Sequence, residues 1–240
     1  DVFPECDQFN GIHEGLVQSW KDIFPKKGEI YFAGALENNE DTGTLQYLAS
    51  TAMEAGFSTR VLDMQALDLQ NGRFFDPAGE LVNRCFKLYP WEWMVDESPD
   101  GCLAEMEWLE PIWKLVMSNK AILATLYELF PDSPYVLPCY LSRPRSGLFC
   151  KKPVFSREGH NVSVVDIRDW EEYVRIAETE GDYNTGAYVY QEYVEPTAYS
   201  GRYPVIGSWI IGGEAAGIGI RENRMEVTDN LSEFVPHIIG

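Results

Sequence analysis

The first third of the chain alternates strand and helix patterns, and this alternation constrains the fold more than any other feature. Glu29–Leu36 and Ser58–Asp63 are short apolar-rich runs that read as strands. Between them, Thr44–Ala55 carries apolar residues at helical spacing, and Gly56 follows where a left-handed cap residue is favoured. A strand–helix–strand order indicates parallel strands joined by a crossover helix. We therefore expect a small parallel α/β layer within residues 1–115.

The rest of the chain changes from this pattern to strand–turn–strand. Further helices are expected over His13–Phe24, Ala104–Leu109, Ile112–Met117, Ser118–Phe130 and Asp169–Ala177, and strands over Phe149–Phe155, Val162–Asp166, Ala187–Tyr193, Val205–Ile211 and Ala215–Ile220. The pair Gly212-Gly213 lies between the last two strands, and this dipeptide is typical of a tight hairpin turn. Antiparallel hairpins should therefore dominate the second half.

The charge balance is strongly acidic. The 240 residues include 38 acidic and 19 basic side chains, which gives a net charge of −19. Such a chain repels nucleic acid, so we expect no nucleic-acid partner, and it attracts cations such as polyamines. Solubility alone is an alternative explanation of the acidity.

The cysteines indicate neither a disulfide framework nor a zinc site. Their number is odd and no C-x-x-C spacing occurs among Cys6, Cys85, Cys102, Cys139 and Cys150. Scattered cysteines in a chain of this length are expected to be reduced thiols. The sequence also has no signal peptide pattern and no run of 18 apolar residues, so a soluble, cytoplasmic protein without a membrane partner is expected.

Several common catalytic motifs are absent from the sequence. It contains no P-loop, no G-x-G-x-x-G after a strand, no H-E-x-x-H and no G-x-S-x-G. The three histidines, His13, His160 and His237, lie far apart in sequence and do not follow metal-ligand spacing. Hydrolases with a nucleophile elbow and zinc peptidases are therefore disfavoured.

One strand followed by a polar loop is the strongest local pattern. Lys152 lies within an apolar strand, and the loop Ser156–Asn161 that follows contains Arg157 and Gly159. A loop of this kind can fold over phosphates and present backbone N–H groups together with a guanidinium. An ordinary hairpin whose lysine faces solvent is the alternative.

A second pattern is a lysine near the start of a predicted helix. If Ser118 is the N-cap, Lys120 falls in the first helical turn, where a cation opposes the helix dipole. A residue that breaks a local rule is a candidate for function, and a bound anion would remove the penalty. A tolerated surface lysine is the alternative.

Two further strand ends carry polar side chains. Gln191 and Glu192 end an apolar strand, where backbone groups could read an adenine and a carboxylate could bind the ribose. Arg221 ends a strand in which Gly217 and Gly219 leave room for a ligand. A fixed guanidinium suits a phosphoryl group in transfer. A plain amphipathic strand and an exposed arginine are the respective alternatives.

Taken in order, these segments resemble the C-terminal synthetase-like domain of glutathionylspermidine synthases, in particular the stand-alone members without an amidase domain. The likeness covers almost all of residues 8–240. It is carried by Glu40–Leu48, Phe86–Trp93, Trp108–Lys114, Ser118–Ala121, Lys152–Gly159, Ile206–Trp209, Ala216–Glu222 and Pro236–Ile238.

The resemblance implies a circularly permuted ATP-grasp fold whose nucleotide-binding portion is 116–240. Family members use ATP with Mg²⁺ to phosphorylate the carboxylate of a glutathione-like peptide, and a polyamine such as spermidine then attacks the acyl phosphate. By the same resemblance, the ATP-binding residues are Lys120, Lys152, Ser156, Gly159, Gln191 and Glu192, and the catalytic residues are Arg157 and Arg221.

The magnesium ligands of the family lie in an acidic, asparagine-containing segment upstream of these motifs. Glu37-Asn38-Asn39 has a similar composition but leads directly into the predicted α/β layer, so we do not assign it to the metal. We expect the ligands to lie upstream of Asp1, the chain to be a fragment of a longer protein, and the isolated fragment to be inactive. A nucleotide-binding pseudoenzyme of the same fold is the alternative function.

Overall fold

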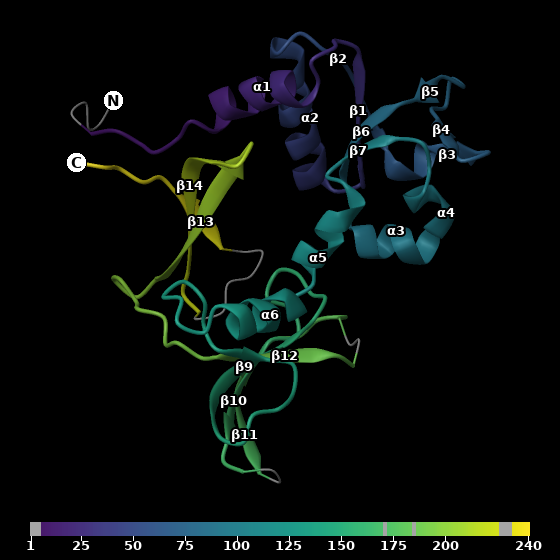
Figure 1. Ribbon diagram of the computed structural model, residues 1–240. Coiled ribbons are helices and arrows are strands. Elements are labelled where there is room, and N and C mark those ends of the chain that lie inside the picture. The colour runs from purple at the N-terminus through teal and green to yellow at the C-terminus, as the bar shows by residue number, and fades with distance from the viewer. Residues whose placement is uncertain (1–5, 170–171, 184–185, 226–231) are drawn as a thin grey trace. The chain divides into compact units, whose positions relative to one another are not determined.

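The chain divides into two compact units (Figure 1). The computed structural model describes residues 6–169, 172–183, 186–225 and 232–240. The first unit comprises Asp1–Leu115, Ser208–Ile218 and Ile238–Gly240, and the second comprises Val116–Gly207 and Gly219–His237. Each unit has its own sheet and its own buried side chains.

A four-stranded parallel sheet forms the centre of the first unit. Its strand order is β2 (Ser58–Asp63), β1 (Glu29–Gly34), β6 (Arg84–Leu88) and β7 (Glu107–Leu109). Each neighbouring pair is parallel. The predicted parallel α/β layer is therefore confirmed.

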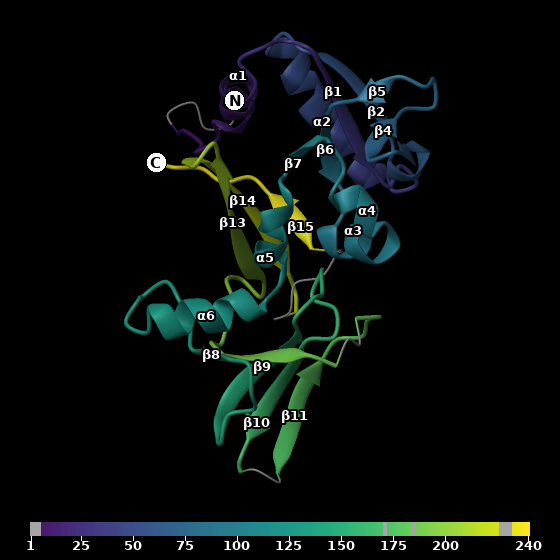
Figure 2. The same ribbon diagram turned by 45° about the vertical axis from the view of Figure 1, so that its right-hand side comes forward.

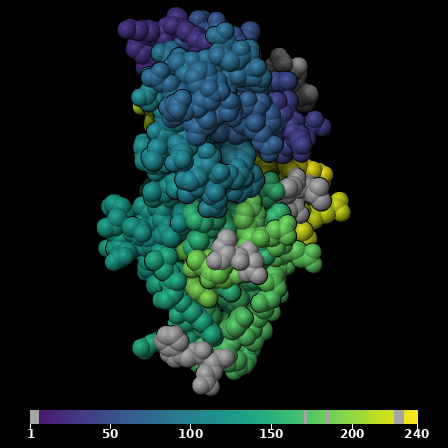
Figure 3. All heavy atoms as spheres, turned by 90° about the vertical axis from the view of Figure 1, so that its right-hand side faces the viewer, coloured from purple at the N-terminus to yellow at the C-terminus, as the bar shows by residue number. Residues whose placement is uncertain are grey.

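Both faces of this sheet are buried, as is usual for parallel sheets. Side chains alternate along β1, so Ile30 and Phe32 pack against helices α1 (Ile12–Ile23) and α2 (Asn39–Glu54) on one face. Tyr31 and Ala33 point to the other core. The second core also contains side chains from residues 74–94. Figure 3 shows the outer surface of this blue segment.

The elements that cover this second face are short. They are β3 (Asp68–Gln70), β4 (Arg73–Phe75), β5 (Leu81–Val82), α3 (Trp91–Glu97) and α4 (Pro99–Cys102), with 3-10 turns at Met64–Ala66 and Ile112–Lys114. Strands β3, β4 and β5 form a separate antiparallel sheet. Ala104–Leu109 was predicted to be helical, and this is wrong, because Glu107–Leu109 forms β7. Parallel pairing with β6, which is distant in sequence, determines its conformation.

Helix α2 begins five residues earlier than its apolar pattern predicted. Asn38 is the N-cap, and its side-chain oxygen accepts a hydrogen bond from the amide of Glu40 at 2.9 Å. The polar first turn has no apolar periodicity, so only the cap marks the start. Gly56 has φ +93° after the C-cap, as expected for a left-handed residue.

A five-stranded antiparallel sheet forms the centre of the second unit (Figure 2). Its order is β11 (Tyr173–Glu178), β10 (Ser163–Ile167), β9 (Gly147–Pro153), β12 (Tyr188–Glu192) and β8 (Cys139–Tyr140). Helix α6 (Ala121–Leu129) packs Ala124 against Cys139 and Val189 on one face of this sheet. The predicted strands at 149–155, 162–166 and 187–193 are confirmed with small shifts of their ends.

The predicted helix over Asp169–Ala177 is wrong. Residues 170–171 lie outside the described residues, and Tyr173–Glu178 forms strand β11. Its register places Ile167 opposite Tyr173 and Asp166 opposite Val174, with a bulge between Val164 and Val165. The cause is the free edge of β10, which offers backbone hydrogen bonds that a local helix pattern does not reveal.

The third sheet has the order β13 (Tyr203–Ile211), β14 (Glu214–Asn223) and β15 (Glu233–Val235). Strands β13 and β14 pass from one unit into the other. Gly212 and Gly213 have φ values of +61° and +90°, which is the left-handed pair required by the predicted tight turn. No helix in the described part of the chain is long and apolar enough to cross a membrane.

Candidate functional site

Lys120 joins helix α6 to the polar loop that follows β9. The chain forms a short helix α5 (Leu115–Ser118) and then α6, with Lys120 at the N-cap. Ser118 is therefore the last residue of α5 and not the predicted N-cap. The side-chain oxygen of Asn119 accepts a hydrogen bond from the amide of Ala121, the first residue of α6, so the new helix begins after Ser118. Lys120 was predicted to lie within the first helical turn; it is instead the N-cap residue, still at the positive end of the helix dipole.

Both the backbone and the side chain of Lys120 bind this neighbouring segment. Its amide donates to the carbonyl of Val154 at 2.8 Å. Its ammonium donates to the carbonyl of Ser156 at 2.6 Å and to the Ser156 hydroxyl at 3.0 Å. Two segments that are 36 residues apart in sequence, each predicted to contact phosphate, are therefore in direct contact.

The loop Ser156–Asn161 has a defined backbone shape. Glu158, Gly159 and Asn161 have φ values of +55°, +73° and +55°, so three of its residues are left-handed. Asn161 donates from its side-chain amide to the carbonyl of Gly181 and accepts from the amide of Tyr183, both at 2.8 Å. The C-terminal end of the loop is thus attached to the segment after β11.

Thr179 is a second attachment point of the loop, and the sequence did not indicate it. Its hydroxyl donates to the carbonyl of Gly159 and accepts from the amide of Val162. Thr179 lies 20 residues from Gly159, and no local pattern relates the two. Only the pairing of β10 with β11 brings them together.

Lys152 and Gln191 meet on one face of the five-stranded sheet. Lys152 lies opposite Val189, so Gln191 is its diagonal neighbour on the adjacent strand. The Lys152 ammonium donates to the Gln191 side-chain oxygen at 2.7 Å. The structure thereby brings together two residues that the sequence assigned to separate motifs.

Two thiols lie near this ammonium group. Burial raises the pKa of the Cys150 thiol, and the positive charge of Lys152 acts in the opposite direction. The pKa of Cys139 is raised for the same reason and is opposed by the Tyr140 amide and by Lys152. Both cysteines therefore stay protonated at neutral pH, and all five cysteines of the chain are free thiols.

All 240 residues of the chain match a family model described as glutathionylspermidine synthase preATP-grasp. The chain belongs to this family. The predicted resemblance is therefore confirmed over residues 1–240.

Curated relatives of this family member are longer than the chain. The “Putative acid–amine ligase” of Haemophilus influenzae is 35% identical over 243 residues, which cover 96% of this chain and 62% of the relative. The bifunctional glutathionylspermidine synthetase/amidase of Escherichia coli is 26% identical over 266 residues, covering 96% of this chain and 42% of the relative. Trypanothione synthetase of Crithidia fasciculata is 35% identical over 130 residues, covering 53% of this chain and 19% of the relative. The chain thus spans less than two thirds of each relative.

A solved structure supports the fold. The crystal structure of a “Putative gamma-glutamylcysteine synthetase” from Methylobacillus flagellatus superposes with a TM-score of 0.59 and covers 99% of this chain and 76% of that chain. Sequence identity is 9%, so the likeness concerns the fold alone. A mixed α/β fold with a parallel sheet is confirmed, and the circularly permuted order of the glutathionylspermidine synthase family stays a prediction.

Arg221 lies in the second unit, on a different sheet from Lys152. It pairs with Phe234 of β15, and its guanidinium carbon lies 5.7 Å from the centre of the Phe234 ring. An exposed arginine was the alternative explanation of this residue, and a surface ion pair with Glu222 or Glu226 would be the simplest contact for it. The ion pair recorded for Glu222 is with Arg202, at 4.0 Å, and Glu226 lies outside the described residues.

Backbone hydrogen bonds within the protein restrict the predicted adenine contact at Glu192. The amide of Glu192 donates to the carbonyl of Pro138 at 2.8 Å, and the next amide, of Tyr193, donates to Leu148 at 3.0 Å. These two backbone donors are therefore already used within the protein. The Glu192 side chain is exposed, so its predicted contact with a ribose stays open.

The described residues suit the phosphates of ATP better than a magnesium ion. Lys120 and Lys152 supply cationic donors, which match anionic oxygens. No group of three or more histidine, cysteine, aspartate or glutamate side chains within the described ranges could hold a metal. Asn38 has a structural role as the cap of α2.

Proposed function

We propose that the chain is the ATP-binding part of an ATP-dependent carbon–nitrogen ligase that forms an amide through an acyl phosphate. In this proposal Lys120 and Lys152 bind the phosphates, and the loop Ser156–Asn161 closes over them. Gln191 orients Lys152, and Glu192 contacts the ribose. Membership of a family whose named relatives are ligases and synthetases supports the reaction class.

The contact between Lys120 and Ser156 carries the proposal. The ammonium holds the first residue of the loop through two hydrogen bonds, so a cation already lies at the entrance of the candidate lid. Phosphate oxygens are stronger acceptors for an ammonium than a neutral carbonyl or hydroxyl. ATP can therefore take over these bonds, which couples nucleotide binding to the position of the loop.

The chemistry needs charge neutralisation and positioning but no protein nucleophile. A carboxylate oxygen attacks the γ-phosphorus, the new O–P bond forms, and the bond to the β-phosphate oxygen breaks to release ADP. An amine then attacks the acyl carbon, inorganic phosphate leaves, and the amine loses one proton. Arg221 stabilises the phosphoryl group in flight, and Arg157 contacts the substrate or the transferred phosphate.

The relatives and the charge support the substrate classes of this proposal. Relatives named for glutathionylspermidine and trypanothione synthesis support a glutathione-like peptide carboxylate as acyl donor and a polyamine-like amine as acceptor. A net charge of −19 attracts such an amine and steers it toward the protein. Magnesium accompanies ATP in this proposal, with ligands supplied from outside the described residues.

The test is turnover by the full-length protein. ADP and phosphate release are measured with magnesium and ATP, alone and with each pair of a peptide carboxylate and a polyamine. A ligase releases both products only when carboxylate and amine are present together. Binding of ATP without stimulated release would instead support the nucleotide-binding protein without ligation, and absence of binding would reject both.

A further inference from the structure

The five-stranded sheet has a second face, opposite to the one that carries Lys152. Side chains alternate along β9, so Lys151 points away from the face that carries Lys152 and Gln191. Lys151 pairs with Tyr190 on β12 and with Ser163 on β10. Lys151 and Lys152 are therefore adjacent in sequence but lie on opposite faces of the sheet.

A small cavity lies on this opposite face. Its volume is about 70 Å³, and its walls are formed by Arg143, Lys151, Val165, Ile167, Tyr173 and Tyr190. The walls thus combine two cations, two tyrosines and two aliphatic side chains. All of these residues belong to the second unit.

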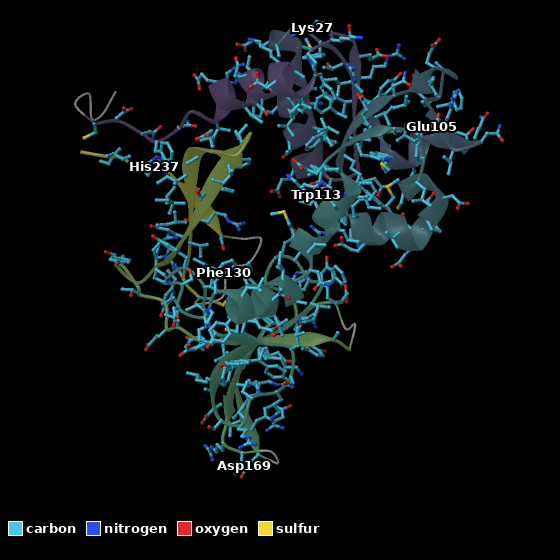
Figure 4. The ribbon with its side chains drawn as sticks, viewed as in Figure 1. Lys27, Glu105, Trp113, Phe130, Asp169 and His237 are labelled. Carbon is cyan, nitrogen blue, oxygen red and sulfur yellow. The ribbon has the colours of Figure 1, made fainter. Side chains whose placement is uncertain are left out.

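Arg143, which lines the cavity, carries a buried hydrogen-bond donor. One terminal nitrogen of its guanidinium donates to the carbonyl of Asp169 at 3.0 Å, at the turn between β10 and β11 where Figure 4 labels Asp169. The guanidinium carbon lies 4.9 Å from the centre of the Tyr173 ring. Its Nε is buried and has no hydrogen-bond partner among the described residues. A buried donor without an acceptor costs about 1–3 kcal/mol, so its presence needs a reason.

The charge of the cavity is positive and is not balanced by its own walls. Among the described residues, none that lines the cavity is acidic, although the chain as a whole has 38 acidic side chains. The Lys151 ammonium lies 3.9 Å from the centre of the Tyr188 ring, so an aromatic face accompanies this charge. An aromatic face stabilises an ammonium less than an anionic oxygen does.

Tyr190 adds a hydroxyl donor. Burial raises the pKa of Tyr190, and the opposing effect of Arg143 does not reverse this. The side chain therefore remains a neutral phenol at physiological pH. Its hydroxyl can donate to an anion beside the two cations.

We infer that this cavity binds a small oxyanion, a phosphate or a carboxylate group, between Arg143 and Lys151. A volume of about 70 Å³ holds such a group but not a nucleotide, because pockets for larger ligands have about 300–1,000 Å³. The site lies on the sheet face opposite to Lys152. It is therefore separate from the proposed ATP contacts of Lys152 and Gln191.

The experiment measures how fast Lys151 is acetylated in the full-length protein. Acetylation is read by peptide mass spectrometry, which separates Lys151 from Lys152, while inorganic phosphate, acetate or chloride is titrated at constant ionic strength. Phosphate or acetate should slow acetylation of Lys151 several-fold with saturation, and chloride should not. Slowing by phosphate alone identifies a phosphate site, and slowing by both anions identifies a general oxyanion site.

Matched variants separate binding from general screening. Arg143→Gln should raise the Kd for the anion about 10- to 100-fold, the loss expected for one charge-assisted hydrogen bond. Arg145→Gln is the control. Arg145 is exposed, lies two residues after Arg143 and is not among the residues that line the cavity, so its replacement should leave the Kd for the anion unchanged. If Arg143→Gln does not fold, Lys151→Gln serves instead, with anion binding measured by ³¹P relaxation of phosphate.

Three outcomes would overturn the inference. They are equal slowing by chloride, an unchanged Kd in a folded Arg143→Gln variant, and protection of Lys151 by ATP but not by phosphate or acetate. The last result would assign the cavity to the nucleotide. Protection of Lys152 by ATP tests the proposed function independently, so the two ideas can fail separately.

Discussion

The ammonium of Lys120 donates a hydrogen bond of 2.6 Å to the carbonyl oxygen of Ser156. This bond fixes the start of the loop Ser156–Asn161, and Asn161 and Thr179 fix its far end. The middle of the loop, Arg157 and Glu158, has exposed side chains. A loop anchored at both ends with an exposed centre is suited to local closure over a ligand.

Nucleotide binding should increase hydrogen-exchange protection in the middle of this loop, because backbone amides there would bond phosphate oxygens and the closed loop would exclude water. Hydrogen exchange of the full-length protein, with and without a non-hydrolysable ATP analogue, measures this effect. The segment β10, Ser163–Ile167, is the internal control and should not change. Equal and strong protection of the loop in both states would contradict a lid.

Replacing Lys152 should weaken ATP binding. Lys152→Met removes a charge-assisted contact worth about 1.5–3 kcal/mol, which is about 10- to 100-fold in affinity. Isothermal titration of ATP with magnesium measures the change. Lys21→Met is the control, because it removes the same charge from an exposed position of helix α1, outside both candidate sites. Similar losses in both variants would indicate a general charge effect and not a site.

Arg221 should act on the rate and not on ATP binding. If it stabilises the phosphoryl group in transfer, Arg221→Ala lowers kcat by about 10²–10³ and changes the KM for ATP much less. Arg221→Lys should recover little, because an ammonium lacks the two-pronged geometry of a guanidinium. Arg202→Ala, which removes ion pairs with Glu222 and Glu233, is the control and should affect stability alone. Unchanged turnover in Arg221→Ala would make it a surface residue.

Asp76 should make the stability of the first unit depend on pH. The amide of Glu80 lowers the pKa of Asp76, and the Ala78 amide, the Tyr31 hydroxyl and Arg60 add to this against the effect of burial. A carboxyl whose pKa is lower in the folded state stabilises it above its unfolded pKa of about 3.9. That stability is lost as the pH falls through the folded value.

Thermal unfolding of the native chain and of Asp76→Asn from neutral to acidic pH checks this sign. The native chain should have the higher Tm at pH 7, and the gap should narrow below about pH 4. Glu105→Gln removes an exposed carboxylate that pairs with Arg73 and should produce a much smaller gap. A gap that stays constant with pH would mean that the charge of Asp76 has no role.

The buried hydrogen bond between Trp20 and Thr51 should be important for stability. The indole N–H donates to the Thr51 hydroxyl at 2.9 Å, and the two residues are 4% and 0% exposed. Thr51→Val leaves this donor without an acceptor and should cost about 1–3 kcal/mol in the free energy of unfolding. Thr44→Val, the same change at an exposed position of α2, should cost less than about 0.5 kcal/mol. Denaturant unfolding compares the two, and equal costs would contradict the assignment.

Much of the first unit could be predicted from the sequence because its signals are local. The helix over Thr44–Ala55 and the strands on either side follow from apolar spacing, and Gly56 marks the end of the helix. Gly212-Gly213 likewise predicted its hairpin turn from two residues alone. The motif strings were also sufficient to identify the family, which requires only the order of residues along the chain.

Pairing between distant strands was decided by the tertiary structure. Tyr173–Glu178 and Glu107–Leu109 became strands because β10 and β6 offered them backbone partners, against the local helix pattern. The same pairing brings Thr179 to Gly159 and sets Lys151 and Lys152 on opposite faces of one sheet. Sequence determined which chemical groups are present and which local turns they favour. Their neighbours depend on hydrogen bonds and packing between segments far apart in the chain, which no local pattern contains.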